Sequence, residues 1–270
     1  MPNEVLSERR PRRDESFRGK SHRRENEPPT SFFDRNIGAR LWGRRPRRDD
    51  VAMNPKRPVI LCDFDGTITN RDVIISIMAH FAPPQWEAIK DEILARRLSI
   101  RAGVERLFAL IPFHRKAEIA AWAVANMTIR QGFVQFLTEV RRRDIEFRVV
   151  SGGMGFFVRP ILAPFAIAPS EILVSDVVER SDGMMGVAWA TPCDDQCNND
   201  CGLCKPTVLR GLVGRHRVVI GDSVTDLAGA RIAETVFARD YLARTLGEEG
   251  RTFYPFETFD DITPKLADLV

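Results

Sequence analysis

The chain has 270 residues, 44% of them hydrophobic, which suits one medium-sized globular domain with a smaller insert. No apolar run approaches the roughly 20 residues that a membrane helix needs. The polar, arginine-rich first segment also lacks the apolar stretch of a secretory signal. We therefore expect a cytoplasmic protein without a membrane partner.

The formal net charge of +3 is unevenly distributed, because residues 1–57 hold 16 basic and 9 acidic residues and the remainder is net acidic. Residues 1–55 show little periodicity and are rich in Arg, Glu, Pro and Ser, so they cannot bury enough apolar surface to offset the entropy of ordering. We predict a disordered basic arm there. It could bind nucleic acid or another anionic partner, act as a targeting segment, or be a solvated tail. The sequence favours the solvated tail and disfavours a nucleic-acid partner.

Order is expected from Pro58 onward. The apolar run 59–62 predicts a buried parallel strand, and a helix is expected over 72–81 with Asp72 as its N-cap. Residues 85–129 have helical apolar spacing without an obvious strand. We therefore divide the chain after the arm into a core at 56–72 and 130–270 and a helical cap at 73–129.

After the insert, predicted helices and strands alternate. Helices are expected at 132–143, 156–162, 206–212 and 228–233, strands at 147–150, 172–174, 218–220 and 235–238, and a β-hairpin at 177–179 and 185–190. This alternation implies an α/β fold built on an open, parallel, Rossmann-like sheet with right-handed crossovers.

Three predicted strands end in polar turns that contain glycine. The turns are 63–67, 151–153 and 221–226, and Lys205 opens the helix that precedes the last of these strands. Ligands of open α/β sheets bind outside the carboxyl ends of the strands, so these turns are expected to converge on one site.

The residue types in these turns suit phosphoryl transfer. Carboxylates such as Asp63 and Asp222 are hard oxygen ligands for Mg²⁺, which screens a phosphate from an attacking carboxylate. A lysine and a hydroxyl can hold phosphoryl oxygens, and a second acid can move protons. Any single aspartate here could equally be a turn or helix-cap residue, but the ordered set favours a site.

Four motifs in this order resemble the haloacid dehalogenase-like (HAD) phosphatases over about residues 58–245. The motifs are Asp63-Phe64-Asp65-Gly66-Thr67, Ser151 after an apolar strand, Lys205, and Gly221-Asp222-Ser223-Val224-Thr225-Asp226. The resemblance implies a phosphomonoesterase that uses Mg²⁺ and an aspartyl-phosphate intermediate on a small phosphorylated metabolite. It also implies that the helical insert is a cap that closes over the site and selects the leaving group.

The resemblance assigns roles to individual carboxylates. Asp63 would attack phosphorus and bind the metal, and Asp65 would act as acid and base while its backbone carbonyl binds the metal. Asp222 would bind Mg²⁺ through its side chain, and Asp226 would stand behind the metal or contact one of its waters.

The resemblance also assigns phosphate binding. The phosphate contacts would be Gly66, Thr67, Ser151, Gly152 and Lys205, of which Ser151 and Lys205 also belong to the catalytic set. For the cap, Met78, His80, Phe81, Trp86 and Arg101 are candidates for specificity, although each could simply be a packing or surface residue.

Four of the five cysteines lie in one short segment before Lys205. They are Cys193, Cys197, Cys201 and Cys204, whereas Cys62 lies in a predicted strand as a small core residue. Clustered thiols suggest metal binding or redox chemistry. Tetrahedral Zn²⁺, two disulfides and reduced thiols that shape a loop all remain open.

Cysteines immediately before the lysine motif give a narrower resemblance, to the methionine-salvage phosphatases of the HAD family. The segments 63–69, 221–226 and 237–242 are similar to them as well. This resemblance implies 2-hydroxy-3-keto-5-methylthiopentenyl-1-phosphate as the substrate. A phosphatase for phosphoserine or for phosphocholine and phosphoethanolamine is the alternative within the family.

Overall fold

The computed structural model describes residues 57–269, so the arm predicted at 1–55 and its possible anionic partner lie outside the described residues. Within 57–269, no helix combines the length and the apolar character needed to cross a bilayer.

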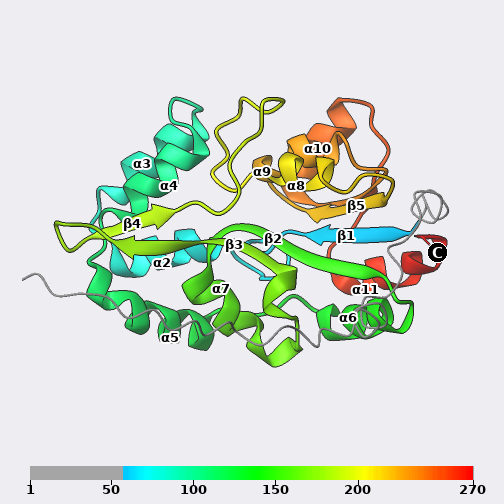
Figure 1. Ribbon diagram of the computed structural model, residues 1–270, viewed down its shortest axis with the longest axis horizontal. Coiled ribbons are helices and arrows are strands. Elements are labelled where there is room, and N and C mark those ends of the chain that lie inside the picture. Colours follow the sequence, from blue (N-terminus) through cyan, green and yellow to red (C-terminus); the bar gives the residue numbers. More distant parts are fainter. Residues whose placement is uncertain (1–56, 270) are drawn as a thin grey trace, which may run out of the picture. The chain divides into compact units, whose positions relative to one another are not determined.

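A seven-stranded sheet organises the described part of the chain, in the order β4-β3-β2-β1-β5-β6-β7 (Figure 1). The strands are β1 (Pro58–Cys62), β2 (Glu146–Met154), β3 (Ile172–Glu179), β4 (Met185–Ala188), β5 (His216–Gly221), β6 (Thr235–Ala238) and β7 (Tyr254–Pro255). Every neighbouring pair is parallel except β3 and β4, which form an antiparallel hairpin. The predicted α/β class and parallel sheet are confirmed.

Both faces of the central strand β1 are buried, as expected of a parallel strand covered by helices on both sides. Ile60 and Cys62 belong to one apolar cluster, and Val59 and Leu61 belong to the cluster on the opposite face. Successive side chains of a strand point to opposite faces, which explains the alternation. Cys62 is a core residue, as predicted.

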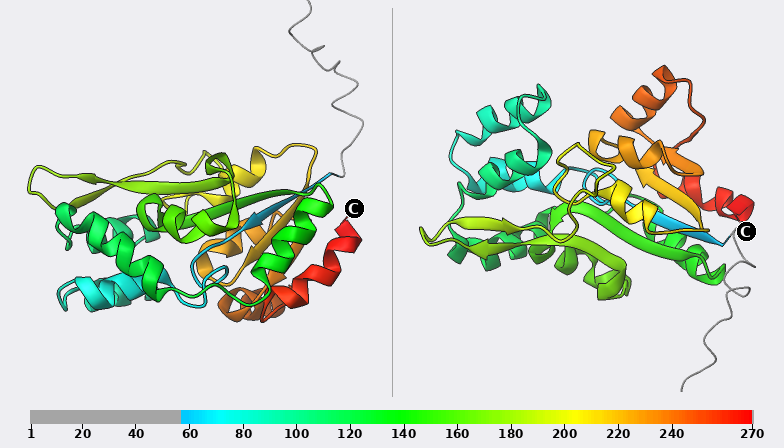
Figure 2. Two further views of the ribbon diagram at one scale, coloured as in Figure 1. Left: turned by 90° about the horizontal axis from the view of Figure 1, so that it is seen from below. Right: turned by 45° about the horizontal axis from the view of Figure 1, so that its top comes forward.

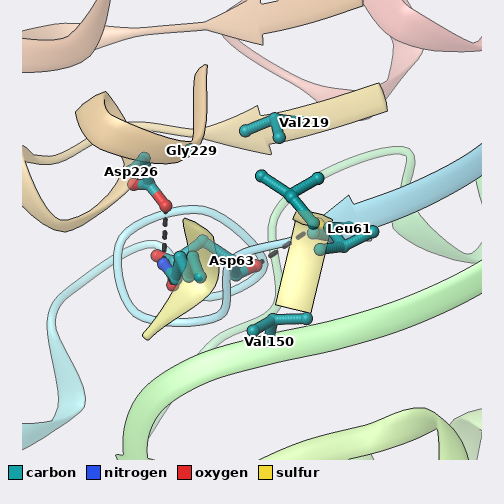
Figure 3. Close-up of a pocket in the computed structure, with 9 residues that line it drawn as sticks. Leu61, Asp63, Val150, Val219, Asp226 and Gly229 are labelled. Carbon is teal, nitrogen blue, oxygen red and sulfur yellow. Dashed lines mark hydrogen bonds and ion pairs between the residues drawn. The ribbon is translucent and has the colours of Figure 1, made fainter. Parts of the chain in front are cut away.

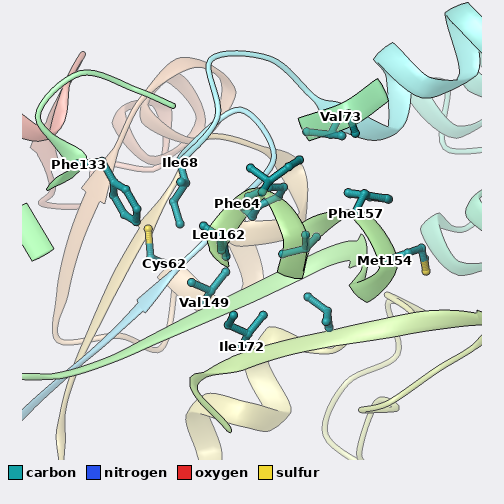
Figure 4. Close-up of a cluster of buried hydrophobic side chains, with 14 of the residues drawn as sticks. Cys62, Phe64, Ile68, Val73, Phe133, Val149, Met154, Phe157, Leu162 and Ile172 are labelled. Carbon is teal, nitrogen blue, oxygen red and sulfur yellow. The ribbon is translucent and has the colours of Figure 1, made fainter. Parts of the chain in front are cut away.

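Helices cover each face of the sheet (Figures 1 and 2). One face carries α6 (Phe133–Arg142), α7 (Gly155–Leu162) and α11 (Phe259–Ile262), and the other carries α8 (Lys205–Arg210), α9 (Val224–Ala230) and α10 (Asp240–Glu248). On the first face, Figure 4 shows Phe64, Phe133 and Phe157 gathered around the end of β1. Short 3₁₀ helices lie at Phe113–Arg115, Ala163–Phe165, Pro169–Glu171 and Thr263–Leu269.

As predicted, the insert between β1 and α6 is built from helices and connecting loops. It contains α2 (Val73–Phe81), α3 (Trp86–Leu94), α4 (Ile100–Phe108) and α5 (Lys116–Asn126). Asp72 caps α2, because its carboxylate accepts the backbone N–H of Ile75 at 2.9 Å. The two ends of this segment lie side by side. Thr69 and Ile129 form an antiparallel β-bridge, and the amide of Asn70 donates to Thr128 O at 3.0 Å.

The structure corrects two predicted strands. β2 does not end before Ser151 but continues to Met154, with a shift in its register against β3 after Val150. The strand predicted at 172–174 and the hairpin arm at 177–179 form one strand, β3. The buried polar residue Ser175 interrupts the apolar pattern there, but its hydroxyl accepts the amide of Ala190 at 3.1 Å. The elements α10, β7 and α11 were not predicted.

Candidate active site

Three adjacent strands bring the predicted motifs together. β1 lies between β2 and β5, and Cys62 pairs with Val149 on one side and Ile220 on the other. The amide of Asp63 donates to Ile220 O at 2.9 Å, which joins the first motif to the end of β5. The turns that follow the three strands therefore meet at one edge of the sheet.

A buried lysine joins two of the carboxylates. Lys205 begins α8, and its Nζ lies 2.5 Å from Asp63 Oδ1 and 2.5 Å from Asp226 Oδ1. Burial alone would lower the pKa of Lys205, but the charges of Asp226 and Asp63 outweigh it and raise that pKa. Lys205 is therefore a fixed positive charge at the centre of the site.

The pKa of Asp63 reflects opposing effects. Burial raises this pKa to about 7, while the positive charge of Lys205 acts to lower it. Asp226 is held more completely, because its Oδ1 accepts from Lys205 and its Oδ2 accepts the amides of Asp222 and Ser223 at 3.2 and 3.0 Å. Both of its oxygens are thus already bonded within the protein.

The third carboxylate, Asp222, is oriented by the loop after β1. Thr67 is fully buried, and its hydroxyl donates a hydrogen bond to Asp222 Oδ1 at 3.0 Å. This bond fixes the orientation of the Asp222 carboxylate. Gly66 has a φ of +78°, and a Cβ there would lie 2.3 Å from Asp222 Oδ2. Burial, followed by the charge of Asp63, raises the pKa of Asp222 to about 9.

Asp65 faces a different set of partners. Its Oδ1 accepts the amide of Val73 at the start of α2 at 2.9 Å, and its Oδ2 accepts the hydroxyl of Ser151 at 3.2 Å. The amide of Gly153 donates to the same Ser151 oxygen at 2.8 Å. Burial raises the pKa of Asp65 well above its ordinary value, which favours the protonated acid.

The site suits a hard divalent cation. One carboxylate oxygen from each of Asp63, Asp222 and Asp226 lies within 4.8 Å of the others. Because both oxygens of Asp226 are already bonded within the protein, Asp63 and Asp222 are the two carboxylates that remain for the ion, and one or two carboxylates are typical of Mg²⁺ sites. Gly66 leaves the space beside Asp222 that a side chain would fill. The donor set therefore fits the predicted metal.

Figure 3 shows the inner wall of the site. A cavity of about 10 Å³ is lined by the charged residues Asp63, Lys205 and Asp226 and by apolar residues that include Leu61, Val150 and Val219. This space is far too small for a metabolite, so it belongs to the packing beneath the charged groups. Gly152 lies toward open space instead, because no atom of residues 57–269 lies within 4 Å of where its Cβ would be.

One buried residue of this site was missed by the sequence analysis. Arg130 lies just after the helical insert and donates to three backbone carbonyls of the loop after β1: Thr67 O at 2.7 Å, Gly66 O at 2.6 Å and Thr69 O at 3.2 Å. Its guanidinium therefore holds the shape of this loop. The only sequence signal was an arginine between Ile129 and Gln131, directly after the insert.

The cap candidates have other contacts. Met78, Phe81 and Trp86 are buried in the apolar core, His80 stacks on Trp122 with ring centroids 4.7 Å apart, and Arg101 pairs with Glu105 and Asp200. Each position has a packing or surface role.

The four clustered cysteines form a second group of side chains, outside the carboxylate site. Their Sγ atoms all lie within 4.8 Å of one another, and all five cysteines of the chain are free.

Comparison with known proteins agrees with this geometry. The sequence matches the haloacid dehalogenase-like hydrolase family over residues 60–231, and the chain belongs to that family. It is a phosphatase of the family. A protein of Bacillus cytotoxicus named 2-hydroxy-3-keto-5-methylthiopentenyl-1-phosphate phosphatase is 46% identical over 213 residues, which are 78% of this chain and 96% of that protein. A Bacillus cereus protein of the same name is 45% identical over the same shares.

Solved structures show the same fold at much lower sequence identity. A phospho-aspartyl intermediate analogue of phosphoserine phosphatase has a TM-score of 0.56 at 20% identity and covers 75% of this chain and 95% of that one. A substrate-bound phosphoserine phosphatase has a TM-score of 0.58 at 19% identity, covering 78% and 98%. These structures support the architecture of a HAD phosphatase.

Proposed function

We propose that the chain hydrolyses 2-hydroxy-3-keto-5-methylthiopentenyl-1-phosphate and that Asp63 attacks its phosphorus. Support for the substrate comes from relatives of that name that are 44–46% identical and match over nearly their whole length. Support for the mechanism comes from one observation above all. Lys205 bridges Asp63 and Asp226 at the carboxyl edge of the sheet, with Asp222 beside them.

Mg²⁺ would be held by the side chains of Asp63 and Asp222 and by the backbone carbonyl of Asp65. Asp226 would act behind the metal, because both of its oxygens already accept hydrogen bonds from the protein. When bound there, Mg²⁺ supplies positive charge that weakens the repulsion between the phosphate and the attacking carboxylate.

In the first step, a bond forms from a carboxylate oxygen of Asp63 to phosphorus, and the bond from phosphorus to the leaving oxygen breaks. Asp65 gives its proton to that leaving oxygen, for which its raised pKa prepares it. In the second step, Asp65 takes a proton from water as the water attacks the aspartyl-phosphate. The bond between phosphorus and the Asp63 oxygen breaks, which releases inorganic phosphate and restores the Asp63 carboxylate.

Other residues position these groups. Lys205 favours the ionised form of Asp63 and can meet a phosphoryl oxygen. Ser151 holds Asp65, and Thr67 holds Asp222. The backbone amides around Gly66 and Gly152 can approach the phosphate, because neither residue has a side chain in the way.

We also propose that residues 73–129 act as a cap on a core made of 56–72 and 130–270. The two connections between the insert and the core lie side by side next to the Asp63 loop, where Thr69 and Ile129 form a β-bridge, and the insert also contacts the core at Pro112, which forms a β-bridge with Met184. α2 begins at Val73, whose amide is bonded to Asp65. Movement of α2 would therefore shift the carboxyl group of Asp65. Closure of the insert over the site would exclude water.

The test is phosphate release by the purified full-length chain with Mg²⁺. We expect kcat/KM for the methylthio substrate to exceed that for phosphoserine by a factor on the order of 100 or more, because relatives of this sequence carry that activity in their names. Chelation of Mg²⁺ should stop turnover. Faster hydrolysis of phosphoserine or phosphocholine would reject the assigned substrate and leave the phosphatase class intact.

Asp63→Asn tests the nucleophile. An amide cannot form the aspartyl-phosphate, so we expect kcat to fall by a factor on the order of a thousand or more. Asp268→Asn, at an exposed carboxylate near the end of the chain, is the control and should keep full activity. Near-normal turnover by the Asp63→Asn variant would exclude covalent catalysis by this residue.

A further inference from the structure

The loop between β4 and α8 gathers four sulfur atoms in one place. The Sγ atoms of Cys193, Cys197, Cys201 and Cys204 all lie within 4.8 Å of one another, and none is joined in a disulfide. Two disulfides would divide the four sulfurs into pairs with bonds of about 2.05 Å. A single group of four has the composition and arrangement of a tetrahedral thiolate site.

We propose that this loop binds one structural Zn²⁺ through all four cysteines. A Zn–S distance of about 2.3 Å places tetrahedral sulfur ligands about 3.8 Å apart, so the observed sulfurs need only small shifts to enclose the ion. Soft thiolates select Zn²⁺ over the Mg²⁺ that suits the carboxylate site. Four protein ligands leave no open position for substrate, and the ion therefore stabilises the loop without taking part in the reaction.

On one side the loop is joined to the start of α8. Cys204 directly precedes Lys205, and its amide donates to Thr191 O at 2.9 Å. Asp194 lies one residue after the first cysteine, and its carboxylate accepts Arg210 Nε of α8 at 2.7 Å. A metal bound here would hold the helix start that presents Lys205 to Asp63.

On the other side the loop reaches the helical insert (Figures 1 and 2). Asp200, one residue before the third cysteine, accepts the hydroxyl of Ser99 at 2.6 Å and the amide of Arg101 at 3.1 Å at the start of α4. Gly202 packs so closely on Trp189 that a Cβ would lie 2.3 Å from its ring. Trp189 in turn donates to Glu105 of α4 at 2.6 Å.

These contacts give the zinc site a definite consequence. The same ion would fix the loop against α4 of the insert and against the lysine of the carboxylate site. We therefore expect loss of the metal to loosen both attachments while the sheet stays folded. This expectation concerns metal content and local order, and it stands or falls independently of the substrate proposed above.

Metal analysis of the full chain, purified without chelator under reducing conditions, is the first test. We expect about one zinc per chain, as a Cys₄ site requires. Replacement by Co²⁺ should produce intense thiolate-to-metal absorption and the visible bands of tetrahedral coordination. Cys201→Ser should lose the metal, and Cys62→Ala, which removes the one thiol outside the cluster, should keep it. Less than half an equivalent of zinc without a tetrahedral cobalt spectrum would overturn the proposal.

A second measurement covers the case in which Cys201→Ser does not fold. A thiol-competing chelator is titrated into the unmodified chain, and zinc release is followed together with hydrogen exchange. Release should raise exchange at 193–210 and 99–105 and leave β1 and β5 protected. Alkylation and mass spectrometry of the native chain distinguish free thiols from disulfides. Two disulfides among these four cysteines would refute a thiolate site.

Discussion

The chemistry of the loop after β1 depends on residues that do not react. Arg130 and Thr69 hold its backbone, since the hydroxyl of Thr69 accepts the amide of Gly66 at 3.2 Å and donates to Phe64 O at 3.0 Å. Contacts within the protein therefore hold the shape of the loop. Such pre-arranged contacts are what make a charged site effective, because little reorganisation is needed during the reaction.

Gly66→Ala should damage the metal site. A Cβ at Gly66 would lie 2.3 Å from Asp222 Oδ2, so the carboxylate must move. We expect the apparent Mg²⁺ constant for activity to rise by a factor on the order of ten or more, equal to about 1.4 kcal/mol. Activity titrations with Mg²⁺ measure this directly.

Gly183→Ala is the matched control for that experiment. Gly183 has a similar φ of +75°, but in the part of the chain that the structure describes no atom lies within 4 Å of its Cβ position. Both variants bear the backbone cost of a left-handed residue, about 1 kcal/mol. Only the Gly66 variant should change the Mg²⁺ constant, and an equal change in both would trace the effect to general destabilisation.

Arg130→Ala should destabilise the protein and slow catalysis. The change removes the Arg130 donor from the buried carbonyls of Thr67 and Thr69 and from the partly buried carbonyl of Gly66, and such losses cost on the order of 3 kcal/mol in total. Denaturant unfolding gives the free energy of unfolding. Arg130→Lys keeps the charge but not the fork of donors, so kcat should fall while KM changes little. Unchanged kcat in both variants would show that Arg130 does not position the loop for catalysis.

At the scale of secondary-structure elements, function depends on where each element begins and ends. α8 begins at Lys205, α9 begins just after Ser223, and both present charged or polar groups from their first turns to the site. β2 continues past Ser151 to Met154 with a shift in its register against β3, and Ser151 lies in this stretch and donates to Asp65. Small changes at these ends would move the reacting groups by more than the reaction tolerates.

The surface of α6 offers a test of pH dependence at this scale. Hydrogen bonds from Arg142 and then Arg143 lower the pKa of Glu139 from 4.5 to about 2. A lowered carboxyl pKa stabilises the folded state above the unfolded value, and this contribution is lost as pH falls from about 4.5 through about 2. Because Glu139 is at the surface, the effect should be modest.

Glu139→Gln should therefore melt at a lower temperature than the unmodified chain at pH 7, and the difference should shrink steadily as pH falls from 5 toward 3. Melting temperatures across this range supply the measurement. Glu87→Gln, at an exposed position of α3, is the control and should give a smaller difference at pH 7. A melting difference for the Glu139 variant that grows in acid would contradict the assigned ion pairs.

At the scale of the whole molecule, the carboxylate site exists only in the folded chain. Asp63, Ser151 and Asp222 come from segments separated by tens of residues and meet because β2, β1 and β5 are neighbours. The unfolded chain has no such cluster. A cation that binds the cluster must therefore stabilise the folded state.

Mg²⁺ at about 100 times its dissociation constant should raise the free energy of unfolding by about 2.7 kcal/mol. Denaturant titrations with and without Mg²⁺ measure the gain, with equal ionic strength from NaCl as the control. Asp222→Asn removes one carboxylate ligand and should lose most of it. A gain that is the same in this variant, or that NaCl reproduces, would show that the ion acts elsewhere on the protein.

The sequence by itself determined the strands from β1 to β5 that carry the site and the helical insert between them. Apolar runs followed by Asp63, Ser151 and Asp222 predicted parallel strands that end in a site. Helical periodicity predicted the insert, with Asp72 as the N-cap of its first helix. These features are local, since strand burial, turn chemistry and helix capping are written in neighbouring residues. Family resemblance then supplied the expected reaction.

Tertiary structure alone decided the contacts between distant segments. No local pattern indicates that Arg130 binds the carbonyls of Gly66 and Thr67, that Ser175 lies inside a continuous β3, or that Asp200 meets Ser99 across 101 positions. It also brought the four thiols together, which spacing alone had left open. Such contacts depend on how packed elements satisfy buried polar groups, and that is a property of the whole fold.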